Sequence, residues 1–161
     1  WDQIIAFEGR MHEFIKAAYD YQDNTFHSHP GYYIDYFEMR LAQLQVLHNL
    51  HYEIKKIRKM PKQALVIADY IMYMADYVVE MNIPDQQIEK LEEISEQMKQ
   101  EELPKTREEF EGRALLYHIL MDLEEFLVYK KRFVNGLDEK KLRIYWKQEM
   151  EQKDSANELQ K

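Results

Sequence analysis

The chain contains no cysteine, and it has only four glycines and four prolines among 161 residues. Without cysteine there can be no disulfides, no thiolate metal sites and no thiol nucleophiles, and a reducing compartment is compatible with this composition. Scarce glycine and proline leave few places for the chain to turn, while the common Glu, Lys, Leu, Gln and Met favour helices. We therefore expect one domain built from a few long helices.

An excess of basic residues is also lacking, because the formal net charge is -8. Nucleic acid is disfavoured as a partner, since binding a phosphate backbone requires a cationic face. Two basic clusters nevertheless occur, at Lys55, Lys56, Arg58, Lys59 and Lys62 and at Lys130, Lys131 and Arg132. Both lie at expected helix ends, where cations interact favourably with the helix dipole and stay solvated. Contact with anionic lipid head groups is the alternative interpretation.

Apolar residues spaced by three and four positions predict a series of amphipathic helices. Their expected ranges are 1–24, 32–59, 61–81, 84–102, 106–135 and 138–150, with a corner at 25–31. The stretch 64–81 is apolar almost all round, but its acidic residues make a membrane span costly, so we expect it to be the central helix of the bundle. The sequence thus predicts an all-α antiparallel bundle of five to six helices. Four long helices form the core, and the short fourth and the C-terminal helix are peripheral.

The helix expected over 106–135 carries its own start and stop signals. Thr106 and Glu109 form a capping box, and Phe110 and Ala114 are expected to point to the core. Gly136 suits a left-handed C-terminal cap. Gly112 inside the helix is unfavourable relative to Ala, which indicates a close approach by another segment. The single domain should cover residues 1–150, and the polar tail 151–161 should fray.

Two clusters of polar side chains could carry chemistry. Asp20, Asp23, His27 and His29 flank the corner and could hold a divalent ion for a metal-dependent hydrolase, although an exposed polar corner is the favoured interpretation. Asp69, Tyr73 and Asp76 share a strip of the apolar helix and could line a ligand pocket, although an outward-facing strip is favoured. The phosphate-binding, dinucleotide-binding, serine-hydrolase and zinc-protease motifs are all absent from the sequence.

The segment Leu103-Pro104-Lys105-Thr106-Arg107-Glu108-Glu109-Phe110-Glu111-Gly112-Arg113-Ala114, with the apolar and acidic pattern that continues to Lys130, carries a resemblance. It resembles the C-terminal domain of the putative aromatic acid exporter family of bacterial membrane proteins. Arg107 and Glu111, and Glu109 and Arg113, are spaced to pair along one helix. The motif residues that could make functional contacts are Pro104, Thr106, Arg107, Glu108, Phe110, Glu111 and Arg113, although a structural role is the favoured interpretation.

The resemblance implies a non-enzymatic domain on the cytoplasmic face of the cell membrane, without a cofactor. Its expected partner is the protein's own N-terminal membrane domain, which is absent from this chain, and a homo-oligomer is a further expectation. The domain would serve assembly or regulation of the membrane part. The alternative is a bundle that senses a small aromatic acid between the second, third and fifth helices.

Overall fold

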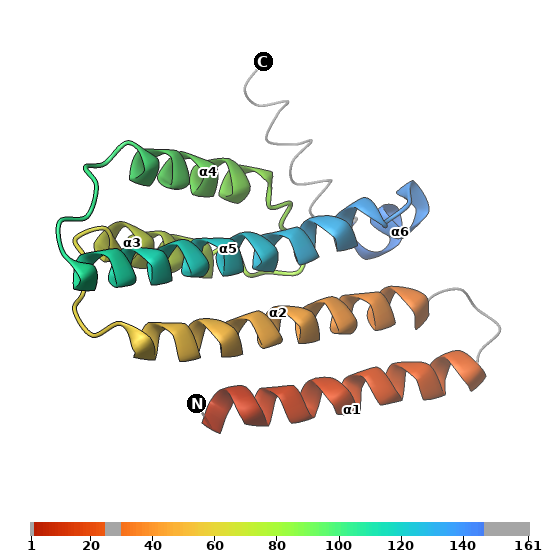
Figure 1. The fold of residues 1–161 in the computed structure, drawn as a ribbon. Helices are drawn as coiled ribbons and strands as arrows, with labels where there is room; N and C mark the ends of the chain where they lie inside the picture. Colours follow the sequence, from red (N-terminus) through yellow and green to blue (C-terminus); the bar gives the residue numbers. More distant parts are fainter. Residues whose placement is uncertain (1, 25–29, 147–161) are drawn as a thin grey trace, which may run out of the picture.

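The computed structural model describes residues 2–24 and 30–146, and this part of the chain forms helices without strands. The helices are α1 (Asp2–Asn24), α2 (Pro30–Lys56), α3 (Ala64–Ala75), α4 (Asp85–Lys99), α5 (Arg107–Asn135) and α6 (Glu139–Tyr145) (Figure 1). The prediction of an all-α bundle is therefore confirmed. Most of the expected corner, residues 25–29, lies outside the described residues, and Pro30 and Gly31 already belong to α2.

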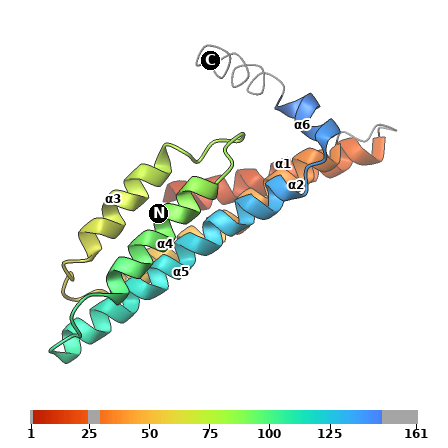
Figure 2. The same cartoon turned by 90° about the horizontal axis from the view of Figure 1, so that it is seen from above.

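Three long helices form one layer, in which α2 packs along both α1 and α5 (Figure 1). The shorter α3 and α4 lie side by side along the first half of α5 (Figure 2). One large cluster of buried side chains joins α2, α3, α4 and α5. A smaller cluster joins the start of α2, the end of α5 and the residue after α6. Only Met11 of α1 is buried, so α1 covers α2 from outside the main core.

The prediction of a long central helix over 61–81 was wrong, because α3 is short and lies at the side of the bundle. The helix ends at Ala75. Beyond it, the N–H groups of Tyr77 and Val78 donate to the carbonyl groups three residues earlier, which tightens the last turn. Only the face with Ile67, Tyr70 and Met74 is buried. On the other faces Leu65 is 70% exposed and Met72 is 73% exposed. Apolar side chains all round a helix therefore do not mean burial all round, since α3 has close neighbours on one face only.

The short helix α4 contributes more to the interior than a peripheral helix would. Its apolar seam was predicted correctly, since Leu91, Ile94 and Met98 are buried in the main cluster. It lies on the outside of the bundle (Figure 1), yet it packs against α5 more extensively than α3 does. The core is consequently closed by two short helices instead of one long one.

The ends of α5 agree with the sequence only in part. Thr106 is the N-cap, and its hydroxyl accepts a bond of 3.1 Å from the Glu109 N–H, as predicted. Phe110 does not point to the core but is 61% exposed. Gly136 was expected in the left-handed region, but its φ of -80° is right-handed, and its N–H bonds back to the last turn. Asp138 caps α6 by accepting from the Lys141 N–H at 2.7 Å, and Met150 lies outside the described residues.

Candidate functional site

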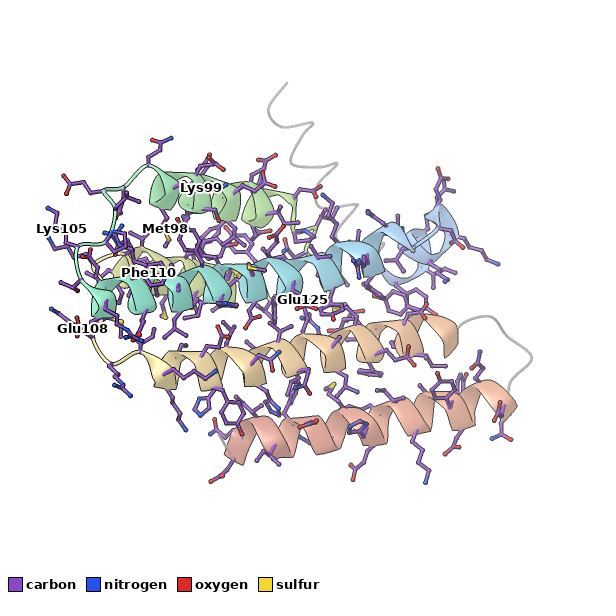
Figure 3. All side chains as sticks on the ribbon, in the orientation of Figure 1. Met98, Lys99, Lys105, Glu108, Phe110 and Glu125 are labelled. Atoms are coloured by element: carbon purple, nitrogen blue, oxygen red, sulfur yellow. The ribbon has the colours of Figure 1, made fainter. Side chains whose placement is uncertain are left out.

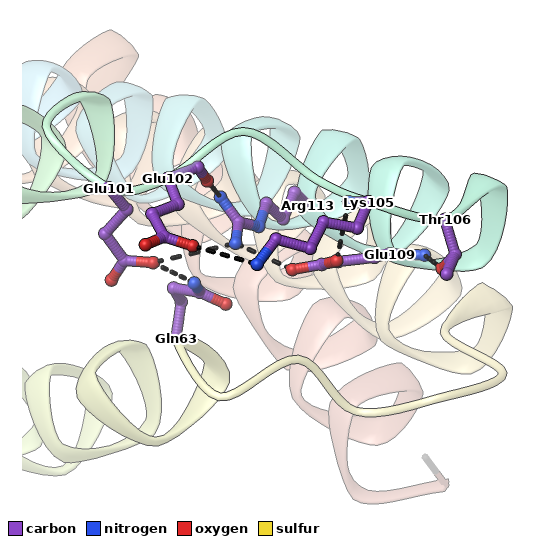
Figure 4. Close-up of polar contacts among 7 residues, drawn as sticks. All are labelled: Gln63, Glu101, Glu102, Lys105, Thr106, Glu109 and Arg113. Carbon is purple, nitrogen blue, oxygen red and sulfur yellow. Dashed lines mark hydrogen bonds and ion pairs between the residues drawn. The ribbon is translucent and has the colours of Figure 1, made fainter.

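The motif that opens α5 lies at the end of the bundle where the α2–α3 and α4–α5 connections meet (Figure 4). The Glu109 carboxylate accepts from the Lys105 N–H at 2.9 Å, one residue before the position that a standard capping box uses. It also accepts from Arg113 Nη2 at 2.7 Å. These contacts, with the Lys105 N–H bond as the largest cause, lower the pKa of Glu109. Glu109 thus links the helix cap to the predicted ion pair with Arg113.

Arg113 joins the start of α5 to the α4–α5 connection. Its Nη1 donates to the carbonyl of Glu102, and its Nη2 lies 3.9 Å from the carboxylate of Glu101. Glu101 in turn accepts from the amide of Gln63, a buried residue directly before α3. Figure 4 shows the side chains of Gln63, Glu101 and Arg113 converging from three segments. This polar network therefore holds three parts of the chain together at one end of the bundle.

A close backbone approach accompanies the network. A Cβ atom added to Gly112 would lie 2.9 Å from Cγ of Pro61 and 3.5 Å from the carbonyl oxygen of Lys59. Such a distance to Pro61 is too short for carbon atoms that are not bonded to each other. The sequence-based expectation of a close approach at Gly112 is confirmed, and the approaching segment is the α2–α3 connection.

A hollow of about 580 Å³ opens beside the network between the two connections. It is lined by cationic and acidic side chains, including Lys62, Glu108 and Arg113, together with apolar Met60 and Leu103. Lys105 Nζ lies 3.2 Å from Glu102 Oε2 within this lining. Because acids neutralise several of its cations, the hollow favours neither sign of charge strongly.

The remaining motif residues face solvent. Arg107 Nε donates to Glu111 Oε1 at 2.9 Å, which confirms the predicted pair along the helix, and both side chains are exposed. Glu108 and Phe110 are exposed as well, whereas Pro104 is half-buried. Lys105, Glu108 and Phe110 mark this end of the bundle in Figure 3. The motif therefore divides into Thr106, Glu109 and Arg113, which make contacts within the fold, and an outward set of Arg107, Glu108, Phe110 and Glu111.

The candidate ligand residues on α3 do not converge on a pocket. Asp69 and Asp76 are exposed, as the favoured interpretation predicted. Tyr73 is half-buried, with Lys90 Nζ 3.7 Å from the centre of its ring and Gln87 Nε2 donating to its hydroxyl at 3.3 Å. The hollow among α2, α5 and the segment 77–84 has a volume of only about 10 Å³, which is too small for an aromatic acid. This hollow therefore cannot hold the aromatic acid that was expected between α2, α3 and α5.

The candidate metal ligands are only partly described. Asp20 and Asp23 are exposed on the last turns of α1, and His27 and His29 lie outside the described residues. Within residues 2–24 and 30–146, no group of three His, Asp or Glu side chains could hold a metal ion.

The opposite end of the bundle contains a buried network that the sequence analysis missed. Lys130 was expected to be solvated, but it is buried, and its Nζ donates to the carbonyl of Glu80 and lies within 6 Å of three aromatic ring centres. The Tyr32 hydroxyl donates to Glu80 Oε1 at 2.7 Å and accepts from Trp146 Nε1 at 3.0 Å. Burial and the bond to Glu80 raise the pKa of Tyr32. A signal existed, because Lys130 lies between Leu127 and Val134 on the predicted apolar stripe.

Two acids, Glu53 of α2 and Asp122 of α5, lie close enough to influence each other electrostatically. Glu53 Oε2 and Asp122 Oδ2 are both enclosed, and neither atom has a hydrogen-bond partner in the part of the chain that the structure describes. Burial, then the charges of Glu53 and Glu125, raise the pKa of Asp122, while His118 lowers it. Sequence spacing gave no sign of this pair, because the two carboxylates come from different helices.

The comparisons with known proteins agree with this architecture. The model of the putative aromatic acid exporter C-terminal domain family matches residues 2–131. The uncharacterized protein YqjA of Bacillus subtilis (strain 168) is 32% identical over 98 residues, which cover 61% of this chain and 30% of that protein. The chain thus spans less than a third of that relative's length.

The crystal structure of a putative membrane protein from Clostridium difficile 630 is similar in fold, with a TM-score of 0.71 and 26% sequence identity. The similarity covers 81% of this chain and 77% of that one. Within residues 2–24 and 30–146, no helix combines the length and the apolar character needed to cross a bilayer. The family model covers most of the chain, from residue 2 to residue 131 within α5. The chain therefore belongs to the family of putative aromatic acid exporter C-terminal domains.

Proposed function

We propose that the chain is a non-enzymatic domain that serves assembly or regulation of the membrane part of an exporter-like protein, from the cytoplasmic side. Family membership supports a partnership with a membrane part, since the family takes its name from exporters. The C. difficile structure is described as a putative membrane protein, which is in keeping with that context.

The observation that carries the proposal is the division of the α5 motif. Arg113 and Glu109 link the start of α5 to the α4–α5 connection, and Glu101 extends this network to Gln63 before α3, so this end of the bundle has a fixed shape. The outward residues Glu108 and Phe110 stay exposed on that fixed surface. Glu108 forms no ion pair within the described chain, and the pair of Glu111 with Arg107 is exposed and therefore contributes little to stability, so both acids can be recruited by a partner.

Co-purification tests this role. The membrane part of the full-length protein, expressed without residues 1–161, should co-purify in detergent with the separately expressed chain. The double variant Glu108→Ala/Glu111→Ala should reduce the recovered complex severalfold, because it removes the outward acids of the motif. The matched control Glu92→Ala/Glu93→Ala, which alters two exposed acids of α4, should leave recovery unchanged. Equal recovery with both double variants, or no complex with the unmodified chain, would contradict the proposal.

A second function, binding of a small aromatic molecule, is favoured by one specific hollow. A groove of about 660 Å³ lies among α1, α2 and α6 and is lined by Phe14, Tyr21, Tyr33, Phe37 and Tyr145. Aromatic rings offer stacking partners for an aromatic ligand. The lining contains no cation to pair with a carboxylate, so this function stands second. Calorimetry with a panel of aromatic acids and their uncharged analogues should give heat that Tyr33→Ala removes, and an absence of heat would exclude it.

A further inference from the structure

The stretch 55–62, at the end of the bundle that carries the α5 motif, is basic, although the chain as a whole is acidic. Between residues 55 and 62 the sequence has five cations, Lys55, Lys56, Arg58, Lys59 and Lys62, and no acid. We call these five residues the basic tip. All five are exposed, and within the described chain none of them forms an ion pair with a carboxylate.

Most acids near the basic tip are paired with other cations, and the exception is Glu108, which lines a hollow with Lys59 and Lys62 and forms no ion pair within the described chain. Glu102 lies 3.2 Å from Lys105, and Glu111 lies 2.9 Å from Arg107. Glu109 is bound by Arg113. The five cations of the basic tip outnumber this one acid, Glu108, so positive charge remains available to an anionic partner, in a chain whose formal net charge is -8.

Three exposed apolar side chains accompany these cations at the same end. Leu103 is 85% exposed, Met60 is 63% exposed and Phe110 is 61% exposed. Met60 and Leu103 line one hollow with Lys59 and Lys62, and Phe110 lines a second hollow with Lys56 and Lys59. We call these three residues the apolar tip. Figure 3 shows Phe110 near the start of α5, at the end of the bundle where the basic tip connects α2 to α3.

We propose that this end of the bundle binds the surface of a bilayer that contains anionic lipids. Phosphate head groups would pair with the cations of the basic tip, and the apolar tip would enter the boundary between head groups and acyl chains. A surface that combines cations with protruding apolar side chains matches the lipid interface, which offers both kinds of partner within a few ångströms. A nucleic acid would offer no partner to the apolar tip. Free phosphate would bind the cations alone, so the exposed apolar side chains would have no role.

The position of α1 is consistent with this orientation. His48 in the second half of α2 lies 3.8 Å from Glu8 near the start of α1, measured from Nε2 to Oε2. The beginning of α1 therefore lies toward the end of the bundle that carries the basic tip (Figure 1). A domain that rests on the membrane through this end would keep its N-terminal helix close to the bilayer.

Vesicle sedimentation tests the proposal without any membrane protein, so its result is independent of the assembly role. The 161-residue chain should bind vesicles of equal parts phosphatidylcholine and phosphatidylglycerol at least about tenfold more tightly than vesicles of phosphatidylcholine alone. Raising sodium chloride from about 0.05 M to about 0.5 M should weaken that binding steeply, because screening shortens the reach of the cations. The salt titration needs no variant, so a folding defect cannot obscure it.

Two matched pairs of variants assign the binding to this end. Lys56→Glu/Arg58→Glu/Lys59→Glu should lower the partition coefficient at least about tenfold. The same change of charge elsewhere, Lys16→Glu/Arg132→Glu/Lys140→Glu, should alter it less than about twofold, because screening limits the effect of distant charges. Met60→Ser/Leu103→Ser/Phe110→Ser should weaken binding severalfold, whereas Leu65→Ser/Met72→Ser/Met121→Ser, at equally exposed positions, should not.

The outcomes that overturn the proposal are distinct. Equal binding to both kinds of vesicle, or equal loss in a variant and its matched control, would remove the basic tip as a lipid site. If the chain does not bind vesicles but co-purifies with the membrane part, this end binds protein instead of lipid. The proposed assembly role would then be retained. A chain that binds vesicles as expected but does not co-purify would retain the lipid surface and lose the assembly role.

Discussion

The two ends of the bundle are held together by different means. At the end with the α5 motif, Arg113 and its acidic partners join connecting segments through ion pairs close to solvent. At the opposite end, Tyr32 and Lys130 lie buried among aromatic rings and share Glu80 as a hydrogen-bond partner. The first end is therefore open to partners and sensitive to salt. The second depends on packing and should tolerate little change.

This contrast shows that one end of the bundle stabilises the fold, whereas the other end presents exposed side chains. A buried aromatic ring contributes several times more to stability than an exposed ion pair does. The buried rings of the opposite end can therefore hold α6 against the start of α2. The motif end needs only enough contacts to hold its connections, and it keeps cations and apolar side chains exposed.

The largest effect is expected at the aromatic end. Tyr32 is completely buried, and its ring stacks on that of Tyr145 with 3.9 Å between the ring centres. Tyr32→Ala should lower the free energy of unfolding by about 3–5 kcal/mol, because it removes a buried aromatic side chain and leaves a cavity. The neighbouring Tyr33 is exposed, so Tyr33→Ala should cost less than about 1 kcal/mol. Urea denaturation measures both, and similar losses would show that the cluster does not anchor this end.

A smaller effect is expected where Pro61 approaches Gly112. Gly112→Ala should cost about 1–3 kcal/mol, because the new methyl group would force the α2–α3 connection away from α5. Gly9 lies in α1 with nothing within 4 Å of an added Cβ, so Gly9→Ala should stabilise by up to about 1 kcal/mol. Thermal unfolding of both variants checks the contrast. If Gly112→Ala were stabilised, the α2–α3 connection would be able to move away from α5 without a cost in free energy.

The ion pairs of the motif end should contribute less still, and their contribution should depend on pH. Arg113→Gln should lower Tm by about 3–5 °C at neutral pH, as expected for the loss of charge-assisted hydrogen bonds. The pKa of Glu109 is lowered from its ordinary value of 4.5, so its contribution is present above that value and is lost as the pH falls through the lowered pKa. The difference from the unmodified chain should therefore shrink below about pH 4.5. A difference that stays constant down to about pH 3 would rule out the Glu109 contact as its source.

The smallest effect is expected midway between the two ends, at Asp122. Its pKa is raised from 3.8, so the stability linked to its protonation is present below that value and is lost as the pH rises through the raised pKa. Asp122→Asn should therefore raise Tm at neutral pH by about 2 °C and have no effect below about pH 3.8. Asp69→Asn, at an exposed acid of α3, should leave Tm unchanged at both values. A lower Tm for Asp122→Asn at neutral pH would show that the ionised carboxyl has a favourable partner.

The elements that could be predicted are those with local signals. Thr106 and Asp138 cap their helices as the sequence indicated, and the seam of Leu91, Ile94 and Met98 is buried. The pairs Arg107 with Glu111 and Glu109 with Arg113 follow from helical spacing alone. The close approach at Gly112 was also predictable, although its partner Pro61 was not.

The elements that were missed depend on which helices become neighbours. The apolar stretch 64–81 looked central, but only one face of α3 found neighbours in α4 and α5. Phe110 shares the helical spacing of core residues, yet the first turn of α5 extends beyond the packed part of the bundle, so its ring is exposed. The electrostatic interaction of Glu53 with Asp122 arises only when α2 and α5 pack together.

The sequence by itself determined the all-α class, most helix boundaries and the α5 motif, because periodicity, capping and spacing are local properties of the chain. The tertiary structure decided that Lys130 is buried while the basic tip is exposed, and the only signal in the sequence was the position of Lys130 on the apolar stripe. The physical reason is that burial depends on the neighbours that packing supplies. Aromatic rings and the Glu80 carbonyl surround Lys130, whereas the side chains of the basic tip remain exposed to solvent.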